Sequence, residues 1–191
     1  MILKYSIAEG YTVRAPERKT KGSAGIDLHI PEFTPRFLED FGGMNRRIAA
    51  AESSLLNGAY GSAYYVFGPI GEIILPPHSR AIIPSGLRFE IPEGWMLEGA
   101  NRGSVSSIQG VIHGAHIIDC DYQGVVFMSI INTSNSLKHF LAGDSLLQVM
   151  LREAPPVVLV QVPEDSLYLG KTSERGEGAL GSTDGDEHGG N

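Results

Sequence analysis

The chain has 191 residues, of which 42% are hydrophobic and 19% charged, and its formal net charge is −7. This length suits one well-buried domain and is short for two, and the composition is that of a globular protein. The negative charge argues against a general nucleic-acid-binding protein, which needs a basic surface to displace counterions. No apolar run is long enough to span a membrane, and residues 1–12 lack a signal-peptide pattern, so we expect a cytoplasmic protein.

The first predicted elements are a strand and a helix. A strand begins near Ser23-Ala24-Gly25-Ile26-Asp27-Leu28 and carries one carboxylate. Between residues 34 and 57 the apolar residues recur at intervals of three and four, which predicts a helix capped by Thr34-Pro35. Gly42-Gly43 weakens its middle, so one helix or two short ones are expected. The apolar stripe of this helix consists of Phe37, Phe41, Met44, Ile48, Ala51 and Leu55.

The rest of the chain is cut into short segments by Gly and Pro. Several of these segments are rich in Val, Ile and Phe, namely residues 81–83, 87–91, 125–131, 146–151 and 157–162. Short β-type runs at this spacing predict a mainly β sandwich or barrel rather than alternating βα units. We expect a single domain over residues 1–183 with a helical insertion at about 34–68, followed by a flexible, acidic, Gly-rich tail over 184–191.

Three polar segments are candidates for binding chemistry. Asn101-Arg102-Gly103-Ser104 combines an arginine with a small hydroxyl residue, which suits phosphate recognition. In residues 117–124, two apolar residues are followed by acidic and turn residues. This pattern predicts a hairpin with one carboxylate that acts as a general base. The Gly-rich residues 175–183 offer backbone N–H groups and two hydroxyls to phosphate oxygens, although the lysine of a P-loop is missing. Taken singly, each segment is also explained by a polar or flexible loop.

Together, the order and spacing of these segments resemble the five motifs of the trimeric dUTPase family, within the dUTPase/dCTP deaminase superfamily. The motifs lie at residues 24–28, 102–104, 118–124, 143–148 and 175–183. The resemblance covers residues 13–32 and 70–183, and residues 34 to about 68 have no counterpart. It implies a distorted jelly-roll β-barrel of the β-clip class that forms a homotrimer. It also implies hydrolysis of dUTP to dUMP and pyrophosphate in sites built from all three chains.

The resemblance further implies roles for individual residues. Asp119 would activate the water that attacks the α-phosphorus, and Asp27 would hold the water shell of a Mg²⁺ cofactor. Ile118 lies where the backbone would read uracil, and Tyr122 would stack under the deoxyribose. The other candidate substrate-binding residues are Arg102, Gly103, Ser104, His113, Gln148, Arg175, Leu180, Gly181, Ser182 and Thr183.

Four positions depart from the family pattern. Gly103 stands where a serine is usual, and Ser145 replaces an arginine that would pair with Asp27. Leu180 replaces a phenylalanine that covers the uracil ring, so stacking there should be weaker. Ala115-His116 resembles the related dCTP deaminases.

Two alternatives remain open. A dCTP deaminase-like enzyme or a pyrimidine pyrophosphatase of relaxed specificity is the first, although Ser129 stands where the deaminases use a glutamate. A zinc deaminase needs several cysteines, whereas Cys120 is the only one. The second is a catalytically decayed trimeric scaffold or protein-binding module, which the changes at Gly103, Ser145 and Leu180 favour and the retained motif residues oppose.

The inserted helix also has two interpretations. Its apolar stripe must pack on something, and we favour the protein's own barrel or a neighbouring subunit. The alternative is a docking surface for another protein, with Arg46 and Arg47 on the polar side.

Overall fold

The structure, a computed structural model, describes residues 1–55, 66–68, 71–171 and 173. It divides into a compact unit, Met1–Pro155, and a second unit that begins at Pro156. The described part of the second unit carries one short 3₁₀ helix, η1 (Glu164–Ser166). The first unit is shorter than the predicted domain of residues 1–183, and the predicted tail lies outside the described residues, so the domain assignment stays a prediction. None of the described helices is long and apolar enough to cross a membrane.

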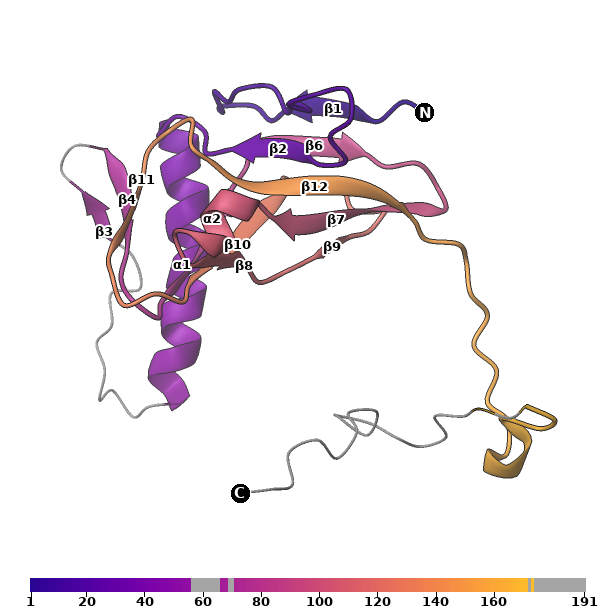
Figure 1. The fold of residues 1–191 in the computed structure, drawn as a ribbon. Coiled ribbons are helices and arrows are strands. Elements are labelled where there is room, and N and C mark those ends of the chain that lie inside the picture. The colour runs from indigo at the N-terminus through magenta and orange to yellow at the C-terminus, as the bar shows by residue number, and fades with distance from the viewer. Residues whose placement is uncertain (56–65, 69–70, 172, 174–191) are drawn as a thin grey trace, which may run out of the picture. The chain divides into compact units, whose positions relative to one another are not determined.

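The first unit is built from four small sheets (Figure 1), and every strand pair within the described residues is antiparallel. The largest sheet has the order β2-β12-β7-β9, formed by Ile26–His29, Ser145–Glu153, Trp95–Asn101 and Ile117–Ile118. The second has the order β5-β10-β8, formed by Arg80–Pro84, Phe127–Asn132 and Val111–His113. The third has the order β11-β4-β3, formed by Lys138–Phe140, Glu72–Leu75 and Val66–Gly68. The fourth has the order β1-β6, formed by Lys4–Ile7 and Leu87–Glu90.

One hydrophobic core joins these sheets. Along β10 buried residues alternate with partly exposed ones, as the period of two in a strand requires, so that Met128 and Ile130 point inward. The same core receives Leu28, Ile73, Ile83, Leu97 and Leu147 from the neighbouring strands. The predicted mainly β fold with an inserted helical segment is therefore confirmed.

The inserted helix, α1 (Pro35–Leu55), is continuous through Gly42-Gly43, so the structure has one helix rather than two. The Phe37 N–H donates to Thr34 Oγ1 at 3.2 Å, which makes Thr34 the N-cap that the sequence predicts. In Figure 1, α1 runs across the direction of β2, β12 and β7. Glycine has no side chain, but its backbone still forms the helical hydrogen bonds. The two glycines therefore lower the stability of the helix without interrupting it.

The first half of α1 packs on its own unit. Phe37 and Phe41 are buried, with their rings stacked at 5.6 Å between centroids. Asn45 is also buried, and its amide pairs with the backbone of Ile82 in both directions: Nδ2 donates to the carbonyl at 2.8 Å, and Oδ1 accepts from the N–H at 2.9 Å. The favoured interpretation of the stripe is thus confirmed for Phe37 and Phe41, whereas Met44 is only partly buried. The side chains of Ile48, Ala51 and Leu55 lie outside the described part of the structure, where the docking alternative stays a prediction.

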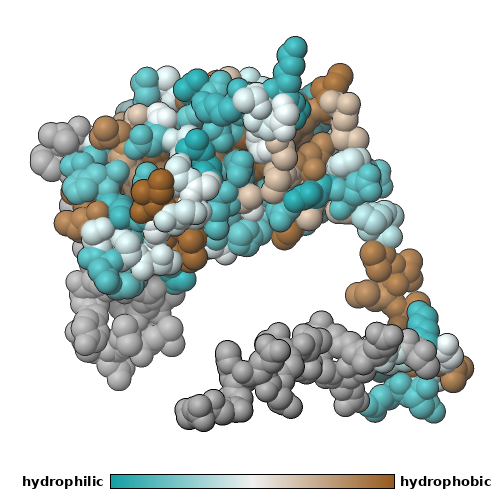
Figure 2. Space-filling view, viewed as in Figure 1, coloured by the Kyte–Doolittle hydropathy of each residue, from teal (hydrophilic) through white to brown (hydrophobic). Residues whose placement is uncertain are grey.

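Residues 157–162 were predicted as a strand, and this prediction is wrong for the single chain. No strand is present between residues 154 and 163. The side chains of Val157, Val158, Leu159 and Val160 are between 74% and 92% exposed, and they form a run of hydrophobic atoms in Figure 2. A strand needs a neighbouring backbone to pair with, and β-forming residues alone do not supply one.

Candidate functional site

A cavity of about 310 Å³ lies beside β2, β12 and the short helix α2 (Gly103–Ser107). Asp27 and Gln148 meet there because they are directly opposite each other in the β2–β12 ladder. Arg102 approaches from the end of β7. The cavity is lined by Lys19, Ser23, Gly25, Asp27, Arg102, Gly103, Ser104 and Gln148, which include five of the predicted site residues.

Asp27 and Arg102 form an ion pair within this polar cavity. Arg102 Nε lies 3.3 Å from Asp27 Oδ1, and Arg102 Nη1 donates to the Ser145 carbonyl at 2.7 Å. Ser145 stands where the family pattern has the arginine partner of Asp27, and in this structure a different arginine, Arg102, reaches the carboxylate. The second oxygen, Asp27 Oδ2, is buried and has no hydrogen-bond partner among the described residues. This oxygen is the one that remains free for a ligand.

Gly25 is required by the close approach of Gln148. The Gln148 amide donates from Nε2 to the Asn101 carbonyl at 2.8 Å, which ties the side chain to the end of β7. A Cβ at position 25 would overlap with Gln148 Oε1 and Cδ. Any other residue at this position would push the amide out of its place in the cavity.

A second cavity, of about 200 Å³, lies between residues 117–119 and residues 126–127. Ile118, Asp119 and Tyr122 line it, so the structure brings these three candidate residues together, and their roles stay predictions. The pairing predicted for this segment is wrong, however: β9 pairs with β7, whereas β10 pairs with β5 and β8. The two strands belong to different sheets, and because they diverge, a cavity opens between them instead of a closed hairpin.

The turn that carries Asp119 is stabilised locally. The Tyr122 N–H donates to the Asp119 carbonyl at 3.2 Å, and the Tyr122 hydroxyl donates to the Val125 carbonyl at 2.8 Å. Gly124 leaves room for the Tyr122 ring, because a Cβ there would contact its hydroxyl. Asp119 itself is exposed, so its carboxylate is accessible to water.

His113 lines neither of these cavities. Its side chain is buried, Nδ1 lies 2.9 Å from the Ser129 carbonyl, and its ring meets that of His116 edge-on at 5.2 Å. Burial lowers the pKa of the His113 imidazole, which favours its neutral form. Within the described residues no group of three His, Cys, Asp or Glu side chains could hold a metal ion directly.

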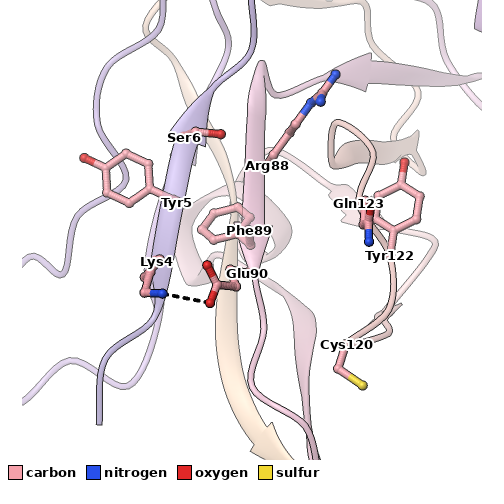
Figure 3. Close-up of a pocket in the computed structure, with 9 residues that line it drawn as sticks. All are labelled: Lys4, Tyr5, Ser6, Arg88, Phe89, Glu90, Cys120, Tyr122 and Gln123. Carbon is pink, nitrogen blue, oxygen red and sulfur yellow. Dashed lines mark hydrogen bonds and ion pairs between the residues drawn. The ribbon is translucent and has the colours of Figure 1, made fainter.

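A third cavity, of about 460 Å³, was not anticipated from the sequence. Figure 3 shows β1 and β6 on one side of it, with Lys4 and Glu90 joined by an ion pair, and the turn with Tyr122 and Gln123 on the other side. Tyr122 borders both this cavity and the one that contains Asp119. The remaining predicted residues, Arg175, Leu180, Gly181, Ser182 and Thr183, lie outside the described residues.

No protein-family model matches the chain. It is, however, 32% identical over 138 residues to the deoxyuridine 5'-triphosphate nucleotidohydrolase (dUTPase) of Dictyoglomus turgidum, covering 70% of this chain and 86% of that protein. The corresponding enzyme of Roseobacter denitrificans is 31% identical over 132 residues, covering 68% and 84%. The chain belongs to the dUTPase family. The chain shares its fold with a dUTPase from phage 80alpha, to which it is 19% identical. The two structures superpose with a TM-score of 0.64, over 95% of this chain and 98% of that chain.

Proposed function

We propose that this protein hydrolyses dUTP to dUMP and pyrophosphate by attack of an activated water on the α-phosphorus. The observation that carries the proposal is the polar cavity that gathers Asp27, Arg102, Ser104 and Gln148 from separate parts of the chain. An arginine fork, a hydroxyl and an amide are suitable partners for phosphate oxygens. Membership of the dUTPase family supports the same substrate, because the curated relatives carry that activity in their names.

The nucleoside end of the substrate is assigned to the cavity of Ile118, Asp119 and Tyr122. Asp119 presents an exposed carboxylate, which accepts a proton from the attacking water as a general base. The Tyr122 hydroxyl is already bonded to the Val125 carbonyl, so the ring is held in one orientation and offers its face to a sugar.

Asp27 is a suitable residue for holding a Mg²⁺ ion through its water shell. Its Oδ2 oxygen has no hydrogen-bond partner within the described part of the chain, and the cavity around it is polar. When bound, Mg²⁺ neutralises phosphate charge, and it typically keeps several waters and uses one or two carboxylates. A dUTPase of phage phi11 of S. aureus coordinates a structural Mg(II) ion, so a protein of similar fold contains this metal.

We further propose that residues 1–183 act as one functional domain and that the protein is a homotrimer. Among the described residues the cavity of Asp27 and the cavity of Asp119 share no lining residue, so neither cavity by itself gathers all the residues assigned to the reaction. A complete site then combines the Asp27 cavity of one subunit with the Asp119 turn of another. Arg175 and residues 180–183 of a third subunit would close over the triphosphate.

The test is pyrophosphate release from each deoxynucleoside triphosphate in the presence of Mg²⁺. We expect dUTP to be hydrolysed far faster than the others. Comparable turnover of dCTP would favour the enzyme of relaxed specificity, and no turnover of any nucleotide would favour the decayed scaffold.

The role of Asp119 is tested by Asp119→Asn, with Asp121→Asn in the same turn as the matched control. Because a positioned general base contributes about 10²–10⁴-fold, Asp119→Asn should lose turnover by that factor while nucleotide binding survives. Asp121→Asn should stay active, since Asp121 lines neither the Asp27 nor the Asp119 cavity in the described structure. Near-normal turnover of Asp119→Asn would refute the assignment.

A further inference from the structure

The loop of residues 14–23 brings a lysine to the polar cavity. The loop is fixed next to Asp27 by the backbone, because the Asp27 N–H donates to the Glu17 carbonyl at 2.8 Å in an isolated antiparallel bridge. Two residues further along, Lys19 lines the same cavity as Asp27 and Arg102. The position of Lys19 thus depends on a tertiary contact with a residue of the proposed phosphate site.

Side chains other than Lys19 hold the shape of this loop, so the loop does not need the Lys19 ammonium to keep its conformation. Arg18 donates from Nε to the Ser23 carbonyl at 2.6 Å and from Nη2 to the Lys21 carbonyl at 3.0 Å. The Thr20 N–H donates to Ser23 Oγ at 3.1 Å. Among the described residues the Lys19 ammonium has one partner, the Glu17 carboxylate, at 2.5 Å.

The Glu17 carboxylate lies between two basic side chains, those of Arg14 and Lys19. Its Oε1 accepts from Arg14 at 2.7 Å as well as from Lys19. The hydrogen bond from Lys19 lowers the pKa of the Glu17 carboxyl. The Glu17 oxygen that accepts from both basic side chains marks a place where one oxygen of an anionic group can sit, and an exposed ion pair of this kind is weak enough to exchange.

The triphosphate needs more positive charge than Arg102 alone provides. The protein carries a net charge of −7, so attraction of an anionic substrate must come from local cations. Arg102 is already shared between Asp27 and the Ser145 carbonyl. Lys19 is the other cation that lines this cavity among the described residues. Because the nucleoside is assigned to the Asp119 cavity, the phosphates that reach Lys19 are those remote from the sugar.

We propose that Lys19 is a further substrate-binding residue, which exchanges the Glu17 carboxylate for oxygens of the β- and γ-phosphates. The inference rests on the proposed function, because it assigns a residue to the triphosphate of the same substrate. Glu17 then acts as a competing anion that holds Lys19 and Arg14 in place until the nucleotide arrives. Removing Lys19 and removing the charge of Glu17 should therefore have opposite effects on binding.

The experiment measures the dissociation constants of dUMP and of a non-hydrolysable imido analogue of dUTP by titration calorimetry with Mg²⁺. Lys19→Ala should weaken binding of the analogue about tenfold or more, the usual worth of a charge-assisted hydrogen bond, and change dUMP binding less than about twofold. Lys19→Arg should restore most of the affinity. Glu17→Gln should bind the analogue more tightly than the unaltered protein, because the competing anion is removed.

Lys21→Ala is the matched control, because Lys21 lies in the same loop but does not line the cavity in the described structure. The inference is overturned if Lys19→Ala binds the analogue within about twofold of the unaltered protein. It is also overturned if Lys19→Ala weakens dUMP and the analogue equally, or if Lys21→Ala has the same effect. If the unaltered protein binds neither nucleotide, the proposed function fails and this inference fails with it.

Discussion

At the scale of single residues, Gly25 decides whether Gln148 reaches the proposed phosphate site. Gly25→Ala should displace the Gln148 amide from the Asn101 carbonyl, because the new Cβ would overlap with the amide. Loss of one phosphate contact should weaken binding of the imido analogue about tenfold, whereas loss of the bond to Asn101 should cost only about 1 kcal/mol of unfolding free energy.

Gly22→Ala is the control for this substitution, since a Cβ at Gly22 would meet only Thr20 Oγ1 at 4.0 Å. Calorimetry and thermal unfolding of both variants separate the effect on the site from an effect on the fold. Unchanged affinity in Gly25→Ala would show that Gln148 does not contact the nucleotide.

The sequence motifs predicted which residues share the polar cavity, but not which of them pair. Asp27, Arg102 and Gln148 were expected together, and the structure brings them together. The partner of Asp27 could not be read from its motif, because Arg102 lies 75 positions along the chain and reaches it only after β2 and β7 have joined β12. Lys19 was missed because a lysine in a basic run is usually a solvated surface residue. The bridge between Glu17 and Asp27 places this exposed lysine beside the cavity.

At the scale of elements, the contact between α1 and β5 attaches the insertion to the sheets. β5 is an edge strand of its sheet, and the Asn45 amide takes the place of a neighbouring strand by satisfying both backbone groups of Ile82. Asn45→Ala should lower the free energy of unfolding by about 1–3 kcal/mol for each backbone group left unpaired and buried.

Arg47→Ala is the control, because Arg47 is exposed on the same helix and should change stability by less than about 0.5 kcal/mol. Chemical denaturation of both variants measures the difference. Equal stability of Asn45→Ala and Arg47→Ala would mean that water replaces the amide at the edge of β5 without cost.

Elements with a strong local pattern were predictable from the sequence, and strand pairings were not. The periodicity of α1 and the N-cap at Thr34 were sufficient to place the helix. By contrast β9 has only two residues, and its pairing with β7 instead of β10 depends on tertiary contacts. Residues 157–162 show the opposite failure, in which a strong β-type pattern forms no strand because none of the described residues pairs with it.

At the scale of the whole molecule, the exposed valines indicate that a single chain is incomplete. Val157, Val158, Leu159 and Val160 are consecutive and at least 74% exposed. Burying each valine is worth about 1.5–3 kcal/mol, so association that covers them is strongly favoured. The proposed homotrimer would supply such a cover, and it would also bring the Asp27 cavity of one subunit to the Asp119 cavity of another.

The assembly is tested by the double variant Val158→Lys and Val160→Lys. If these side chains lie between subunits, two buried lysines without partners should dissociate the trimer, and light scattering should then report the mass of one chain. The unit Met1–Pro155 should still unfold cooperatively, since its hydrophobic core contains neither residue. Turnover of dUTP should be lost together with the trimer, because the proposed site combines residues of several subunits. The control is Glu164→Gln with Asp165→Asn, which changes the charge of the same unit by an equal amount and leaves the valines intact.

A double lysine variant that remains an active trimer would show that these valines are not buried between subunits. An unaltered protein that is an active monomer at working concentration would refute the assembly itself.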